Sequence, residues 1–217
     1  MSPDTSGTAG PHPDLRSLYC NALGLIGDSS MPSSHPDVPG LFARLQPDDL
    51  TIRCRRTWHG IRSINPALNG GDFAASIIQF SADGHHFSFF IEAMRPAGEN
   101  EWQWGGTSGG ERPVDEMENV GGFSVIGGSY VCVGGLTTNR PNVAAIQVEH
   151  ADSSQITVAV GDDGAVIALA PVVSAPSSED EVIVRNLDAS GGVLSEDRTW
   201  IGDGGPPPAD MFAAMRS

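Results

Sequence analysis

Apolar and polar residues alternate in short runs along the chain from Gly121 to Leu194. Glycine, aspartate, asparagine or proline stands at nearly every break between these runs. Because neighbouring side chains of a strand point to opposite faces, this period of two predicts short antiparallel strands. We expect seven of them, in the segments GGFSVIGG, SYVCVGGL, NVAAIQVEH, SQITVAVG, AVIALAPVV, EVIVRNLD and GGVLSED. The pattern indicates an immunoglobulin-like antiparallel β-sandwich over residues 121–200.

Alternate residues of four of these segments are expected to line one core. They are Ile146, Val148, Ile156, Val158, Ile167, Leu169, Val182 and Val184. A sandwich buries one face of each strand, which is why we assign every second apolar residue to the same interior.

The first half of the chain shows the same period of two. The segment LTIRCRRTWHGI predicts a strand with Ile52, Cys54 and Trp58 on one face and Arg53 and Arg55 on the other. A hairpin is predicted next, in FAASIIQFSADGHHFSFFIEAM, because Asp-Gly favours a two-residue turn. Its second strand should divide its side chains between the faces, with Phe87, Phe89 and Ile91 on one and Ser88, Phe90 and Glu92 on the other.

Apolar residues recur at helical spacing ahead of these strands. They are Leu15, Leu18, Tyr19, Ala22, Leu23 and Ile26. The spacing predicts an amphipathic helix over 13–26, with Gly27 as its stop. A helix this short needs a partner surface, and we expect a sheet of its own chain. Docking on another chain is the alternative.

The organisation along the chain follows from these patterns. We expect a disordered tail over 1–12, a helix with strands over 13–110, a polar connection over 111–120, the sandwich over 121–200 and a Gly/Pro-rich tail over 201–217. The strands of both halves should share a core, as one continuous unit over 13–200.

Charge narrows the choice of partners. The chain has 27 acidic and 12 basic residues and a net charge of −15, and every basic residue is arginine. Residues 1–110 hold 11 acidic and 7 basic residues, against 16 and 5 in 111–217. A surface this negative repels phosphate backbones, so we expect no nucleic-acid partner.

The residues support neither a disulfide or metal-binding protein nor a membrane protein. Cys20, Cys54 and Cys132 are widely spaced and form no CxxC pair, so neither a disulfide scaffold nor a zinc ribbon is expected. The adjacent His85 and His86 match no metal motif, and we expect no metal and no cofactor. The N-terminus shows no signal peptide and no long apolar run exists, so we expect no membrane partner. Cytoplasmic location is the expectation, with signal-less export as the alternative.

Ser108 is the one candidate nucleophile. The segment GTSGG matches G-x-S-x-G, which in hydrolases exposes a serine on a turn between a strand and a helix. Pro113 stands where that helix would continue, and no histidine lies in the upstream context of the chymotrypsin-like proteases. A glycine-rich turn is therefore the favoured interpretation, and a serine hydrolase is the alternative.

Two further groups of side chains could bind a ligand. Trp102 and Trp104 share one face at their spacing, which suits a stacking platform for a sugar and also a core strand; we favour the core. Arg53 and Arg55 belong to the only basic cluster, with Arg56 and Arg62. A carboxylate of the same chain is their expected partner, and an anionic ligand or an acidic partner surface is the alternative.

The strand-rich part resembles a known group of proteins. The segments EWQWGGTSGG, YVCVGGL, NVAAIQVEHADSSQITVAVGDDGAVIALAPV and EVIVRNLDASGGVL, over about residues 100–195, resemble uncharacterised immunoglobulin-like β-sandwich proteins of GC-rich Gram-positive bacteria. The resemblance implies a β-sandwich and no activity.

These observations lead to one hypothesis about function and two alternatives. We expect a mainly β, non-enzymatic binding or assembly module, with a protein partner or a second copy as its ligand. The alternatives are a hydrolase using Ser108 and a carbohydrate-binding sandwich using Trp102 and Trp104.

Overall fold

The computed structural model describes residues 15–29, 40, 42–62, 69–111, 124–126, 130–137, 141–150, 155–162, 164–171 and 181–200, without the side chains of 26–29, 124–126 and 199–200. The expected tails over 1–12 and 201–217, and the connection after Glu111, lie outside these residues. The elements are α1 (Arg16–Ser29), the 3-10 turn η1 (Pro47–Asp49), β1 (Thr51–Trp58), β2 (Asp72–Ala82), β3 (His85–Arg95), β4 (Gln103–Glu111), β5 (Ser124–Ile126), β6 (Tyr130–Leu136), β7 (Ala145–His150), β8 (Gln155–Ala159), β9 (Ala165–Pro171), β10 (Glu181–Leu187) and β11 (Val193–Trp200).

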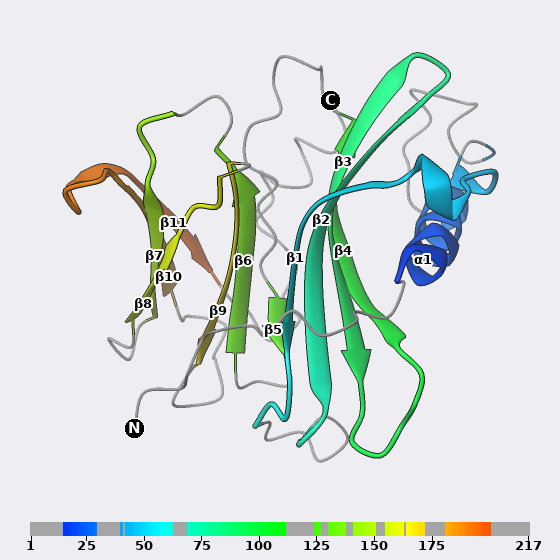
Figure 1. Ribbon diagram of the computed structural model, residues 1–217, viewed down its shortest axis with the longest axis horizontal. Coiled ribbons are helices and arrows are strands. Elements are labelled where there is room, and N and C mark those ends of the chain that lie inside the picture. The colour runs from blue at the N-terminus through cyan, green and yellow to red at the C-terminus, as the bar shows by residue number, and fades with distance from the viewer. Residues whose placement is uncertain are drawn as a thin grey trace.

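The described strands form three antiparallel sheets. Sheet A has the order β1-β2-β3-β4, sheet B has β5-β6-β9, and sheet C has β11-β10-β7-β8. The sheets stack side by side with sheet B in the middle, and α1 lies against the far side of sheet A (Figure 1). The expected mainly β fold with one N-terminal helix is confirmed.

The first core lies between α1 and sheet A. Leu15, Tyr19 and Leu23 of the helix side pack there against Ile78 and Phe89 of the sheet. The hydroxyl groups of Tyr19 and Ser76 form a buried hydrogen bond of 2.7 Å, which satisfies two polar groups that would otherwise be stranded in this interface. Docking of the helix on its own chain is therefore confirmed.

The second core lies between sheets A and B and contains residues from both halves of the chain. Its members are Cys54, Ile61, Phe73, Ala75, Ile77 and Phe90 from the first half, and Cys132, Leu136, Ala165, Ile167 and Leu169 from the second. The two halves thus share apolar packing across the sheet interface.

The third core lies between sheets B and C, and here one prediction is wrong. Ile146, Val148 and Val182 are buried there as expected, with Ile156, Val158 and Val184 packed against them. Ile167 and Leu169 instead face the second core, while Val166 and Ala168 between them face the third. The reason is that β9 is buried on both faces, so an apolar period of two does not tell which face meets which sheet.

The hairpin of β2 and β3 is confirmed. Asp83 has φ +50° and Gly84 has φ +85°, as a two-residue turn between antiparallel strands requires. Phe87, Phe89 and Ile91 pack in the first core and Phe90 in the second, which is the division that the alternation predicts.

The face of β1 is predicted only in part. A β-bulge between Ile52 and Cys54 shifts the register of β1 against β2. Ile52 therefore packs with the first core, while Cys54 and Trp58 belong to the second. A bulge inserts one residue, so it reverses the faces of everything that follows it.

Candidate functional site

Strand β4 carries the GTSGG segment and is the edge strand of sheet A. The expected turn at this segment is wrong. Residues 106–111 pair regularly with β3, and Ser108 stands opposite Phe90. Glycine favours turns in a sequence, but glycines also allow two backbones to lie close together in a sheet. Gly109 shows this need, because a Cβ there would lie 2.3 Å from the carbonyl oxygen of Ser88.

The surroundings of Ser108 differ from those of a hydrolase nucleophile. The residue is half-buried in an extended strand, and the sharp turn of the G-x-S-x-G motif is absent at this position. His59 follows β1, at the opposite edge of sheet A, so two strands separate it from Ser108. The structure does not bring these two side chains together.

Trp102 and Trp104 present unequal surfaces. Trp102 precedes β4, packs against the first core and carries the Arg95 guanidinium 5.3 Å above its ring. Trp104 is 41% exposed, and its indole N–H donates to the Thr107 hydroxyl at 2.8 Å. Trp104 is therefore the more exposed of the two rings, while Trp102 is half-buried.

Arg53 and Arg55 were expected on one face of β1, and this expectation is wrong. Arg53 donates to Gln79, which lies on the sheet-B side of β2 as Ile77 does. Arg55 stands opposite Ser76, and its charge acts on Tyr19 of the helix side. The bulge at Arg53 puts Arg53 and Cys54 on the same face of β1, so Arg55 lies on the opposite face from Arg53.

Asp72 is the centre of an ion-pair cluster that the sequence pattern did not predict. The carboxylate accepts from the Arg95 guanidinium, from His59 at 3.2 Å and from the Gly60 N–H at 3.3 Å. Burial tends to raise the pKa of Asp72, but these contacts outweigh it and hold the pKa below the ordinary carboxyl value. The signal was the position of Asp72 at the start of a hairpin, where it stands opposite Arg95.

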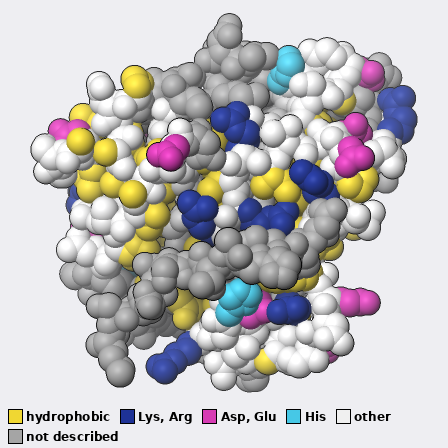
Figure 2. Space-filling view, in the orientation of Figure 1, with side chains coloured by type: hydrophobic (Ala, Val, Ile, Leu, Met, Phe, Trp, Pro, Cys, Tyr) yellow, Lys and Arg dark blue, Asp and Glu magenta, His cyan; other side chains and the backbone are white. Residues whose placement is uncertain are grey.

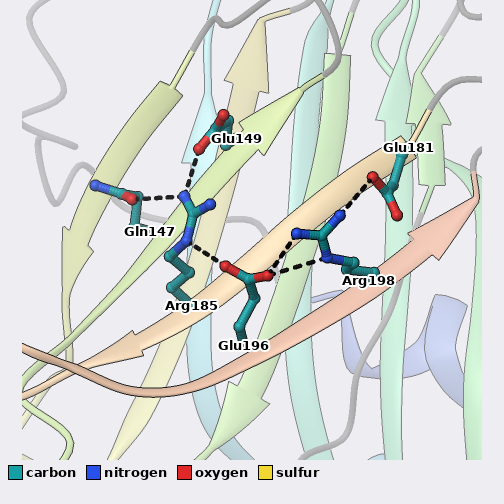
Figure 3. Close-up of polar contacts among 6 residues, drawn as sticks. All are labelled: Gln147, Glu149, Glu181, Arg185, Glu196 and Arg198. Atoms are coloured by element: carbon teal, nitrogen blue, oxygen red, sulfur yellow. Dashed lines mark hydrogen bonds and ion pairs between the residues drawn. The ribbon is translucent and has the colours of Figure 1, made fainter.

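A second ion-pair network covers the outer face of sheet C (Figure 3). Arg185 pairs with Glu149 and with Glu196 at 2.7 Å, and Arg198 pairs with Glu196 at 2.9 Å and with Glu181 at 3.2 Å. The residues come from β7, β10 and β11, so the network ties three neighbouring strands together. Every charge in it has a partner, which indicates a structural role.

Other chemistry is sparse in the described part of the chain. None of the three cysteines forms a disulfide, and all three are buried. Burial, with Glu92 nearby, raises the pKa of the Cys132 thiol well above its usual value, so it is a poor nucleophile. No group of three or more His, Cys, Asp or Glu side chains could hold a metal ion among these residues. No helix of this part is long and apolar enough to cross a membrane.

The outer edge of β4 is the least protected strand edge that the structure describes. Natural edges are kept from pairing by charges, bulges or short length. β1 carries three arginines and a bulge, and β11 carries Glu196, Asp197 and Arg198. β5 and β8 have three and five residues, and β9 contacts both neighbouring sheets at its sides.

β4 lacks most of these devices. It has nine residues, and its one charged side chain, Glu111, is bound to His85 at 2.6 Å. Its bulge lies near its start, so 106–111 stay in regular register with β3. Its outer edge pairs with no strand among the described residues. Helix α1 contacts β4. The outer edge of β4, which no described strand pairs with and which carries exposed Trp104, is the candidate functional site.

Comparison with known proteins adds no family to this picture. No family model matches the chain, and no curated protein matches it. The class that the fold defines is a helix-capped stack of three antiparallel sheets.

Proposed function

We propose that this chain is a non-enzymatic assembly module that pairs with a second copy of itself through the outer edge of β4. The observation that carries the proposal is the contrast between β4 and the charged, short or covered edges elsewhere in the same molecule. Two copies of β4 laid antiparallel join two sheets into one continuous sheet, and backbone hydrogen bonds supply the affinity.

The local charge favours this occupant. The whole chain carries −15, but Gln103–Gly110 is uncharged and the Glu111 carboxylate is hydrogen-bonded to His85. Copies that meet at β4 therefore avoid direct repulsion, and charges further away are screened within about 8 Å at physiological salt. Self-association should consequently strengthen as salt is added.

Strand order supports an immunoglobulin-like origin for β5–β11. If β5–β11 are given the immunoglobulin strand letters A to G in chain order, sheet B of this protein has the strand order A-B-E and sheet C has the strand order G-F-C-D. A constant-type immunoglobulin domain has A-B-E-D and C-F-G. The two differ by one strand, because β8 pairs with β7 here instead of with β9. We propose that β5–β11 are an immunoglobulin-like sandwich with its fourth strand switched.

The first prediction tests assembly. Sedimentation velocity from about 1 µM to about 1 mM should show a monomer–dimer equilibrium. A Gly110→Lys variant should weaken dimerisation at least about ten-fold, because a charged side chain on a strand edge blocks strand addition. A Cβ at Gly110 meets no atom within 4 Å, so the variant leaves the monomer intact.

Gly40→Lys is the control, since Gly40 is exposed and, like Gly110, has open space where a Cβ would lie. It should leave the dimer unchanged. A protein that stays monomeric over the whole range, or equal weakening by both variants, would refute the assembly proposal. Stoichiometric labelling of Ser108 by a serine-reactive phosphonate would refute its non-enzymatic character.

A further inference from the structure

Trp104 and Gly109 give the two ends of β4 opposite shapes on one face of sheet A. Trp104 pairs with Ala93, and Gly109 pairs with Phe89. Ala93 and Phe89 both pack in the core between sheet A and α1, so Trp104 and Gly109 belong to the same face of the strand. The indole is 41% exposed, and the glycine is exposed as well, although α1 contacts β4. One end of the strand therefore carries an open ring, and the other end has open backbone.

The Trp104 ring is held in place by the middle of the same strand. Its indole N–H donates to the Thr107 hydroxyl at 2.8 Å. The bulge near the start of β4 leaves Gly105 without a partner on β3, so Trp104 and Thr107 lie on one face although three residues separate them. Thr107 pairs with Ile91, which also packs in the core beneath α1. The middle of β4 thus presents a hydroxyl group beside a ring of fixed orientation.

We propose that two copies of β4 pair antiparallel about Thr107, so that Trp104 of each copy covers Gly109 of the other. This register rests on the proposed assembly, because the same edge of β4 makes the joint. Thr107 is the middle residue of Gln103–Glu111, so the register pairs the strand along its whole length. When the bulge is counted in both copies, Trp104 stands opposite Gly109 of the second copy, and the two residues share one face.

Two contacts stabilise the joint in this register. The Trp104 ring covers backbone that Gly109 of the second copy leaves open, as aromatic side chains do for glycines across a strand pair. Thr107 meets its own copy on the two-fold axis, and opposed threonines hydrogen-bond across strands. Because the ring is already fixed by its hydrogen bond to Thr107, it loses little freedom on association.

Charge favours the same register. Glu111 is the one charged residue of β4. Pairing about Thr107 places the two Glu111 carboxylates at opposite ends of the joint, roughly 25 Å apart, which is well beyond the screening length of about 8 Å. A register centred on Glu111 would bring them side by side in a chain of net charge −15. Charged side chains are scattered over the face on which Figure 1 draws sheet A (Figure 2), whereas Gln103–Gly110 has none.

Cysteine cross-linking of the full chain tests the register. Thr107→Cys places two thiols opposite each other, within the Cα separation of about 4.4–6.8 Å that a disulfide needs. At about 100 µM protein in a glutathione redox buffer, most of this variant should run as a covalent dimer on a non-reducing gel. Gly110→Cys is the matched control, because a Cβ there meets no atom within 4 Å. Its two thiols would lie roughly 20 Å apart, so this variant should stay monomeric on the gel.

Sedimentation velocity tests the ring. Trp104→Ala should weaken dimerisation at least about ten-fold, and Val193→Ala, which shortens another exposed apolar side chain on β11, less than about two-fold. Equal weakening by both variants would overturn the role of the ring. A dimer in which Thr107→Cys does not cross-link, or in which Gly110→Cys cross-links equally fast, would overturn the register and leave the assembly standing. A chain that stays monomeric up to about 1 mM would overturn both.

Discussion

Gly134 on β6 lies directly beneath the ring of Phe90 on β3. A Cβ at this glycine would come 2.3 Å from the Cε2 atom of the ring. Side chains essentially never come this close, so an alanine here forces Phe90 to move within the packed core between sheets A and B. The sheets can approach each other at this point because one residue has no side chain.

Gly134→Ala should therefore lower the free energy of unfolding by about 1–3 kcal/mol. Urea denaturation followed by circular dichroism measures the loss. Replacing the Phe90 ring by the smaller leucine should relieve the clash with the new methyl group. The double variant Gly134→Ala with Phe90→Leu should therefore lose less free energy of unfolding than the sum of the losses of the two single variants, by at least about 0.5 kcal/mol. Strict additivity would show that the two residues do not collide.

Single residues also mark where sequence reasoning stops. The apolar character of Ile167 and Leu169 predicts burial correctly, and both are buried. The face they occupy was not predictable, because Val166 and Ala168 are equally apolar and equally buried. Alternation tells faces apart only where one of them is polar.

At the scale of elements, Asp72 holds three segments together. It joins the start of β2 to the end of β3 through Arg95, and to the loop after β1 through His59 and Gly60. The pKa of its carboxyl group lies below the ordinary value in the folded chain. The stabilisation is complete above the ordinary carboxyl pKa of about 4, and it is lost as pH falls through the lower folded-state pKa.

Asp72→Asn should lower the free energy of unfolding by about 1–3 kcal/mol at pH 7, since charged hydrogen bonds are lost. The difference from the native chain should shrink as the pH falls below about 4, because the native carboxylate is then protonated too. Urea denaturation at a series of pH values measures both effects. Asp197→Asn, at an exposed position on β11, is the control and should show neither. A loss that is constant with pH would contradict the ionic role.

Element prediction succeeded where turn chemistry and periodicity agreed. The hairpin of β2 and β3 combines alternating apolar residues with Asp83-Gly84, and both point to the same structure. The segment GTSGG has glycines and no alternation, so composition alone suggested a turn. Its pairing with β3 comes from the neighbouring strand, which a local pattern does not reveal.

At the scale of the whole molecule, residues of both halves meet in the core between sheets A and B. We expect the described sheets to unfold together. Val182→Ala, at a fully buried position between sheets B and C, should cost about 2 kcal/mol. In a Trp200→Phe background, Trp58, Trp102 and Trp104 remain, and all lie in or beside sheet A.

In the Val182→Ala variant, the fluorescence of these three tryptophans should report the same shift in urea midpoint as circular dichroism does. If Val182→Ala leaves the urea midpoint of tryptophan fluorescence unchanged, sheet A unfolds independently of sheet C. In that case the chain would be two units, and not one continuous unit over 13–200.

The stacking of three sheets could not be predicted from the sequence pattern. The strands from β5 to β10 fall in the segments that alternation predicts, β11 runs three residues beyond its segment, and the helix docks as its apolar stripe requires. Which strands neighbour one another depends on contacts between distant residues, such as Cys132 on β6 opposite Leu169 on β9. The bare edge of β4 was hidden for the same reason, because an edge exists only once the order of strands is known.

The central position of sheet B has a consequence for synthesis of the chain. The ribosome releases α1 and the whole of sheet A before β9 begins at Ala165. Until then, Phe73, Ile77 and Phe90 lack the part of their core that β9 supplies. The nascent chain thus carries an open apolar surface while much of the second half is still being translated. Exposed surface of this kind attracts chaperones and invites aggregation. Slow codons placed between β4 and β9 would prolong that exposure, and fast ones would shorten it.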